Sequence, residues 1–152
     1  RESAMIDPPD KDSPLGAIRK VFEELIPFNK YLGLKVDEMA AGHCVMSVDF
    51  REDFVGDIGK GMVHGGVIST LIDTAGGATA FTVLDFDREH SLNTVDMRVD
   101  YMRPGQGKRF IATGSVTRRG SRLCVTQVDV HNDEGMHIAR GTAVYSVMKR
   151  PK

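Results

Sequence analysis

A single carboxylate stands in the most apolar stretch of the chain. Asp73 is the only charged residue between His64 and Asp85. An unpaired carboxylate inside an apolar helix costs on the order of several kcal/mol. Asp73 must therefore either be bonded to a nearby hydroxyl or backbone group, or act as a general base or nucleophile. We predict the second role.

A glycine-rich motif precedes this stretch, at the point where a helix is expected to begin. It spans residues 61–66 and reads GMVHGG. Glycines leave the first N–H groups of a helix unobstructed, and the positive end of the helix dipole adds to their attraction for an oxyanion. The motif predicts a site that stabilises negative charge on an attacked carbonyl, with close backbone packing as the alternative.

The spacing of the two features predicts an oligomer. Gly65 and Asp73 are eight residues apart, which is roughly 12 Å at the rise of an α-helix. One chain cannot easily bracket a single carbonyl with both. If both act on the same carbonyl, Gly65 of one subunit must face Asp73 of its partner, and the protein must be a homo-oligomer.

Other polar side chains are weaker candidates. Thr94 follows on a predicted strand, where its hydroxyl could orient a water molecule beside the carboxylate. The five histidines are scattered and have no spacing typical of zinc, so we expect no metal. The sequence also contains no nucleophile elbow, phosphate loop or dinucleotide motif.

Basic residues gather in the last third of the chain and flank predicted turns. They are Arg103, Lys108, Arg109, Arg118, Arg119 and Arg122. Guanidinium groups bind phosphate well, so we predict substrate contacts by Arg103, Arg119 and Arg122, with Gly66 and Gly120 in the adjoining turns. A solvated rim is the alternative for most of this cluster.

Helical and strand patterns indicate what must position these residues. Ser13 and Pro14 begin an amphipathic helix that is expected to end at Pro27. A second helix, from about Gly65 to Val83, is apolar nearly all round, as in a buried helix. The predicted strands are Leu34–Met39, Cys44–Phe50, Leu92–Tyr101, Phe110–Thr117, Leu123–Val130 and Ile138–Val147. An antiparallel sheet curling round the second helix would bury its whole circumference.

The bulk properties fit one domain in a reducing compartment. The chain has 152 residues and a formal net charge of −1. It therefore lacks the excess of positive charge that is typical of general nucleic-acid-binding proteins. Two cysteines are too few for a disulfide framework, and no stretch approaches the length of a membrane span. We expect a flexible segment at 1–12, a single domain at 13–150 and a cytoplasmic location.

Several segments together resemble a known family. Residues 61–67 and 71–75 follow the pattern G-x-x-H-G-G and then L-x-D-x-A. Further matching segments are Thr94–Met97, Tyr101–Pro104 and Arg119–Leu123. From roughly Tyr31 to Met148 the chain resembles the hotdog-fold acyl-CoA thioesterases, in particular the phenylacetate-degradation (PaaI-like) branch.

The resemblance implies an α+β hotdog fold, in which a curved antiparallel sheet of five to six strands wraps round a long buried central helix, here with an extra N-terminal helix. It implies hydrolysis of acyl-CoA without metal or organic cofactor. Asp73 would be the base or nucleophile, and the Gly65 N–H the oxyanion donor. His64 would shape the helix entry and Thr94 would help to hold water. Family members pair sheet edges into dimers, often doubled to tetramers.

One position departs from the family. Relatives often carry Asn or Gln six residues before the motif histidine, where this chain has Ile58, so an amide contact to substrate or water is missing or moved. The alternatives are an acyl-carrier-protein thioesterase, a non-catalytic acyl-CoA sensor and a pure assembly protein. The sequence also leaves open the acyl group, for which Phe54 and Phe81 are candidate pocket residues, and the choice between general-base and covalent routes.

Overall fold

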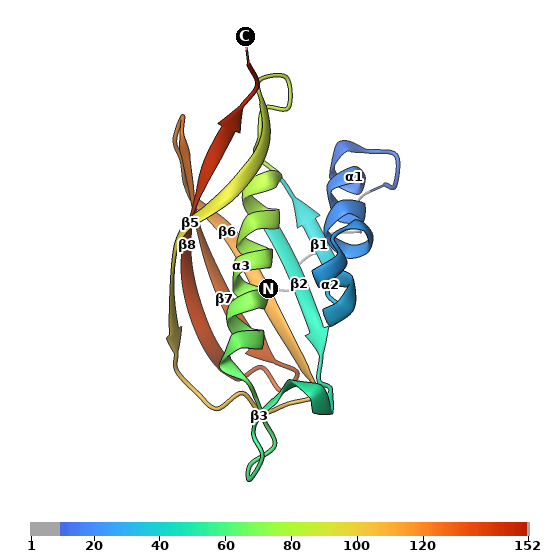
Figure 1. Cartoon of the computed structure of the whole chain (residues 1–152), viewed down its shortest axis with the longest axis vertical. Coiled ribbons are helices and arrows are strands. Elements are labelled where there is room, and N and C mark those ends of the chain that lie inside the picture. Colours follow the sequence, from blue (N-terminus) through green and yellow to red (C-terminus); the bar gives the residue numbers. More distant parts are fainter. Residues whose placement is uncertain (1–9, 152) are drawn as a thin grey trace, which may run out of the picture.

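A six-stranded antiparallel sheet forms the frame of the protein (Figure 1). The computed structural model describes residues 10–151, so most of the predicted flexible segment 1–12 lies outside the described residues. In spatial order the strands are β1 (Lys35–Ala40), β2 (His43–Asp49), β6 (Arg109–Arg119), β7 (Leu123–Asn132), β8 (His137–Lys149) and β5 (Glu89–Tyr101). All neighbours are antiparallel. The prediction of five to six strands is confirmed.

The long helix α3 (Gly65–Phe81) lies against one face of this sheet (Figure 1). It contacts β2, β5, β6, β7 and β8. Its sheet-facing residues are buried: Ile68, Leu71, Ile72, Ala75, Gly76, Ala78, Thr79 and Ala80. The prediction that the whole circumference is buried is wrong for the protomer, because the sheet covers only one side of α3. A polar strip that includes Gly66, Thr70 and Asp73 stays at least partly exposed.

Glycines let α3 approach the sheet closely. A Cβ atom at Gly76 would lie 2.6 Å from the hydroxyl of Tyr145 and 2.7 Å from Oγ1 of Thr126, which is closer than side chains tolerate. At the neighbouring Gly77 the nearest atom would be 3.5 Å away, an ordinary contact. Packing therefore requires glycine at position 76 and does not require it at position 77.

The N-terminal region is more complex than the single predicted helix. It contains α1 (Pro14–Lys20), the π-helical turn η1 (Val21–Leu25) and α2 (Pro27–Leu32). Ser13 caps α1 as predicted, because its hydroxyl accepts the N–H of Gly16 at 3.0 Å. Pro27 does end the first helical run, but it also begins α2, since proline is favoured at the first helical position.

The segment between β2 and α3 holds small regular elements. They are a 3₁₀ turn, η2 (Glu52–Phe54), and a hairpin made of β3 (Val55–Asp57) and β4 (Met62–Val63). The hairpin projects beyond the sheet below the start of α3 (Figure 1), and Ile58 near its tip is 94% exposed. Between residues 10 and 151, no helix is both long and apolar enough to cross a membrane.

Candidate active site

The side chain of Asp73 meets two hydroxyl groups from neighbouring strands. Thr94 donates a hydrogen bond from Oγ1 to Oδ1 of Asp73 at 2.9 Å. The phenol of Tyr145 donates to the backbone carbonyl of Asp73 at 2.7 Å and lies 3.4 Å from Oδ1. The carboxylate is half-buried rather than enclosed in apolar core. Hydroxyl donors and solvent access together remove the penalty that an unpaired buried charge would carry.

Sheet register explains why Thr94 and Tyr145 reach the same carboxylate. The two residues are direct partners across β5 and β8, so their side chains share one face of the sheet. A bulge between Thr94 and Asp96 then shifts the alternation of β5. Before the bulge Leu92 and Thr94 face α3, and after it Met97 packs against the core.

Tyr145 is a fixed hydrogen-bond donor at this site. Its side chain is 2% exposed. Burial first, and then the nearby Asp73 carboxylate, raise the pKa of Tyr145 well above its usual range. The phenol therefore stays protonated throughout the physiological range and can only support, not replace, the negative charge of Asp73.

The start of α3 holds a second polar arrangement. His64 is the N-cap, and its Nδ1 accepts the N–H of Gly66 at 2.8 Å. That donor is therefore already engaged, which leaves the N–H of Gly65, the first residue of the helix, without a carbonyl in a preceding helical turn. The Tyr101 phenol donates to the carbonyl of Gly65 at 2.9 Å and so joins the helix start to the end of β5.

Gly65 and Asp73 both lie on α3 and are roughly 12 Å apart by helical rise. The structure thus keeps the two predicted catalytic groups separate within one protomer. Of the predicted site residues, Thr94 lies beside Asp73. His64 and Gly66 lie with Gly65 at the start of α3.

A pocket of about 200 Å³ opens beside Asp73. The carboxylate of Asp73 and the hydroxyl groups of Thr94 and Tyr145 are part of its lining. The remaining lining residues are Phe22, Ile26, Asn29, Thr74, Gly77, Phe81 and Leu92. Of the two aromatic residues predicted as pocket candidates, Phe81 lines the pocket. Phe54 lies elsewhere in the core. The volume is below the roughly 300–1,000 Å³ of pockets that enclose a drug-sized ligand, so one protomer holds only part of a large substrate.

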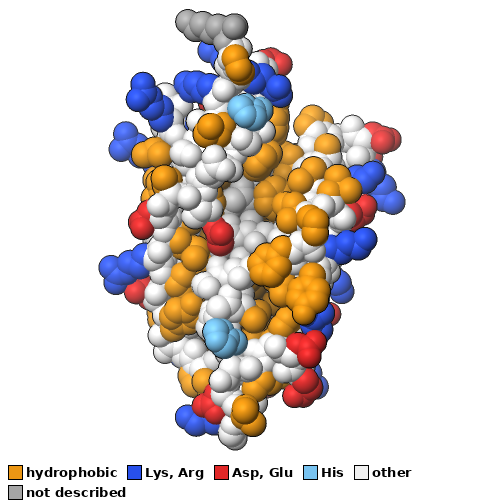
Figure 2. Space-filling view, in the orientation of Figure 1, with side chains coloured by type: hydrophobic (Ala, Val, Ile, Leu, Met, Phe, Trp, Pro, Cys, Tyr) orange, Lys and Arg blue, Asp and Glu red, His pale blue; other side chains and the backbone are white. Residues whose placement is uncertain are grey.

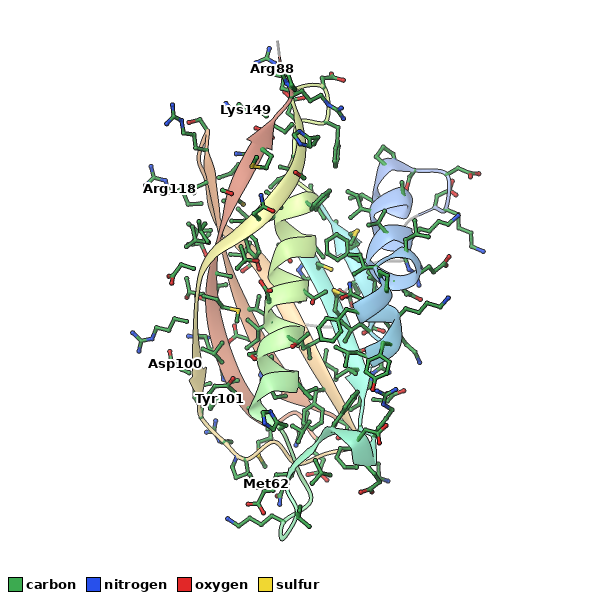
Figure 3. All side chains as sticks on the ribbon, in the orientation of Figure 1. Met62, Arg88, Asp100, Tyr101, Arg118 and Lys149 are labelled. Atoms are coloured by element: carbon green, nitrogen blue, oxygen red, sulfur yellow. The ribbon has the colours of Figure 1, made fainter. Side chains whose placement is uncertain are left out.

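The predicted phosphate-binding residues lie at opposite ends of the molecule. Arg103 follows β5 near the start of α3 and donates to the carbonyl of His137 at 3.0 Å. Arg119 and Arg122 flank the β6–β7 turn at the far end, on the side where Figure 3 shows Arg118, while Tyr101 lies beside the start of α3. Arg119 is engaged by the buried carboxylate of Glu89 and by the carbonyl of Gly120. Arg122 is exposed.

Sequence reasoning missed Tyr145 and Tyr101 as site residues. Both are strand residues whose contacts to α3 span long stretches of sequence. One signal was available for the position of Thr94: the apolar residues Leu92, Val95, Met97 and Val99 break strict alternation after Leu92, which is typical of a bulge at this point of the strand.

A sheet wrapped against a helix that carries the candidate carboxylate is the hotdog arrangement, and comparisons with known proteins agree. Residues 60–139 match the sequence profile of the thioesterase superfamily. The medium/long-chain acyl-CoA thioesterase YigI of Salmonella typhimurium LT2 is 33% identical over 147 residues, covering 90% of this chain and 95% of the relative. YigI of Escherichia coli K12 matches to the same extent.

Solved structures give the same assignment. A Shewanella oneidensis protein described as related to the thioesterase superfamily superposes with a TM-score of 0.81 at 38% identity, covering 88% of this chain and 94% of that one. The chain belongs to the thioesterase superfamily. The predicted class, a hotdog-fold thioester hydrolase, is thereby confirmed.

Proposed function

We propose that the protein hydrolyses acyl-CoA thioesters to a free acid and CoA. The observation that carries the proposal is the Asp73 carboxylate, held by Thr94 at the mouth of a mostly apolar pocket. The relatives named as medium/long-chain acyl-CoA thioesterases support a CoA ester as substrate.

Two routes fit the site. As a general base, Asp73 takes a proton from water while the water oxygen attacks the thioester carbonyl. The Gly65 N–H stabilises the resulting oxyanion. Collapse then breaks the C–S bond, and the leaving CoA thiolate takes up the proton from Asp73. As a nucleophile, the carboxylate attacks directly, expels CoA thiolate and forms an acyl anhydride that water then hydrolyses.

Pairing of β5 edges would bring the separated groups together. β5 ends the sheet and bonds only to β8 among the described strands, and a long exposed edge is a template for another strand. Antiparallel pairing about a two-fold axis at Arg98, with Val95 as the extra residue of the bulge, would set Thr94 opposite Tyr101 of the second copy. Because Thr94 contacts Asp73 and Tyr101 contacts Gly65, each Asp73 would then face the other copy's Gly65.

Further parts of the proposal follow from this arrangement. Arg103 and Arg122 are candidates for the CoA phosphates, whereas the ion pair with Glu89 gives Arg119 a structural role. Residues 13–150 act as one domain, as a dimer or a dimer of dimers in the cytoplasm, and the PaaI-like branch is the proposed subfamily. His64 positions the helix start through its bond to Gly66.

The direct test is release of CoA from a panel of aliphatic and aromatic acyl-CoA esters, followed by free-thiol detection. Asp73→Asn keeps the size of the side chain and removes its charge, so turnover should fall at least about a hundredfold, which equals about 2.7 kcal/mol in the barrier. Asp87→Asn, at an exposed position outside the pocket, is the matched control and should retain full turnover.

Unchanged turnover in Asp73→Asn would remove Asp73 from the mechanism. Binding of acyl-CoA by the wild type without hydrolysis would favour the sensor alternative. Neither binding nor turnover would favour an acyl-carrier-protein substrate.

A further inference from the structure

The N-terminal helices form one wall of the pocket that contains Asp73. We call residues 14–32 (α1, η1 and α2) the N-terminal cap. Phe22 and Ile26 of the cap line the pocket, opposite Gly77 and Phe81 of α3. Figure 2 shows hydrophobic side chains gathered over the cap on the right, facing a hollow between the cap and the rest of the molecule.

Hydrogen bonds within the cap fix its shape, and another joins it to the sheet. The Ile26 N–H bonds to the carbonyl of Val21 at 3.0 Å across the π-helical turn. Asn29, only 3% exposed, donates from Nδ2 to the carbonyl of Phe22 at 2.9 Å. The carboxylate of Glu23 accepts the backbone N–H of Val36 at 3.0 Å, which joins η1 to β1. A wall fixed in this way can select a ligand by shape.

The floor of the pocket runs along α3. Asp73, Gly77 and Phe81 all line it and follow at intervals of four residues, so they lie on one side of the helix. By helical rise the floor is roughly 12 Å long from Asp73 to Phe81. The rings of Phe22 and Phe81 make a T-shaped contact with centroids 5.6 Å apart, so that end of the pocket is apolar.

Gly77 stands in the middle of this floor. A Cβ there would make only ordinary contact, 3.5 Å from the ring of Tyr145, so packing does not demand glycine. Glycine inside a helix is unfavourable by about 1 kcal/mol relative to alanine. Gly77 and Ile26 both line the pocket, so a larger side chain at position 77 would take up pocket volume.

We propose that the acyl chain of the substrate runs from Asp73 over Gly77 to Phe81, beneath the N-terminal cap, and that Gly77 and Ile26 determine the accepted chain length. This inference rests on the proposed thioesterase function. With its carbonyl at Asp73, the chain meets the apolar side chains of Phe22, Ile26, Phe81 and Leu92, and Asn29 and Thr74 complete the lining. A flexible aliphatic chain is the ligand that fits a narrow apolar path of this kind.

The test compares kcat/KM for butyryl-CoA and decanoyl-CoA. Gly77→Leu fills the floor beyond Asp73 and should lower the value for decanoyl-CoA at least about tenfold, with the value for butyryl-CoA within about threefold of wild type. Ile26→Trp narrows the path from the cap and should produce the same selectivity. Leu25→Trp is the matched control, because Leu25 is 57% exposed and lies outside the pocket lining; it should alter neither value.

An equal loss of kcat/KM for both esters in Gly77→Leu and Ile26→Trp would overturn the inference, because these residues would then contact a part of the substrate that both esters share. Unchanged kcat/KM for both esters would also overturn it, because these residues would then not contact the substrate. Thermal unfolding verifies that each variant is folded. Calorimetric binding of the two esters to Asp73→Asn, alone and combined with Gly77→Leu, does not need turnover. A loss of decanoyl-CoA affinity alone would support the acyl path even if the wild type hydrolyses neither ester, and equal affinities with and without Gly77→Leu would refute it.

Discussion

Replacing Thr94 by valine removes the hydroxyl that donates to Asp73 and keeps the shape of the side chain. A hydrogen bond to a charged group contributes about 1.5–3 kcal/mol. Because Thr94 is exposed in the protomer, we take a lower value of about 1–2 kcal/mol. If the bond positions the carboxylate for the reaction, kcat should fall about five- to thirtyfold, whereas Thr94→Ser should retain most of the activity.

The assay is release of CoA from the best ester of the panel, measured at saturating substrate to isolate kcat. Thr142→Val is the matched control, because Thr142 is an exposed threonine on β8 and does not line the pocket. Both valine variants should unfold within a few degrees of the wild type, since valine suits a strand. Full activity of Thr94→Val would refute the idea that this hydroxyl positions Asp73.

Further predictions concern the stability of the fold and the reactivity of a buried thiol. Gly76→Ala should lower the free energy of unfolding by about 1–3 kcal/mol through its clash with the Tyr145 hydroxyl, while Gly77→Ala should leave it unchanged or raise it by up to about 1 kcal/mol; denaturant titration measures both. Arg119→Ala should lower the free energy of unfolding by on the order of 2–3 kcal/mol in the same titration at neutral pH, because it leaves the buried Glu89 carboxylate without its ion-pair partner. Burial opposes ionisation of Glu89, but the Arg119 hydrogen bond, the Asp85 N–H and nearby positive charge together lower its pKa. The stability from this pair is therefore present above the ordinary glutamate pKa and is lost as pH falls through the lowered value, so thermal unfolding of Glu89→Gln should depend less on acid pH than that of the wild type. Burial, with the charges of Asp37 and Glu38, raises the pKa of the Cys44 thiol to about 12, so iodoacetamide should modify Cys44 only after denaturation, and rapid modification of the native protein would contradict this.

The regular elements around Asp73 were predictable because their signals are local. Helix α3 has a glycine-rich start and an apolar sequence, and each long strand lies between turn residues. The helix predicted to end at Pro27 is present as α1 and η1, but α2 was missed because Pro27 was interpreted only as a stop, although proline also favours the first turn of a new helix.

Contacts that depend on tertiary packing were harder to predict from the sequence. The bond from Tyr145 to Asp73 joins residues far apart in the chain, and no local pattern distinguishes Tyr145 from any other inward-facing strand residue. The polar strip of α3 was misjudged because a hydrophobic count does not reveal which side of a helix the sheet leaves uncovered. Likewise, Arg119 resembles a phosphate ligand in sequence, and only the fold places it against the buried Glu89.

The central claim is that each active site combines Asp73 of one subunit with the Gly65 N–H of another. Gly65→Pro removes this donor while suiting the first helical position and the extended conformation of His64, whose ψ is 134°. Gly65→Ala adds a Cβ at the same place, 3.3 Å from the Tyr101 ring, but keeps the N–H, and it should remain active as the matched control.

The most direct measurement is the activity of a hybrid in which one subunit carries Asp73→Asn and the other Gly65→Pro, purified through two different affinity tags. Each parent oligomer should be nearly inactive. The hybrid dimer has one site with both groups intact, so we predict about half of the wild-type activity. A hybrid no more active than its parents would contradict the shared site.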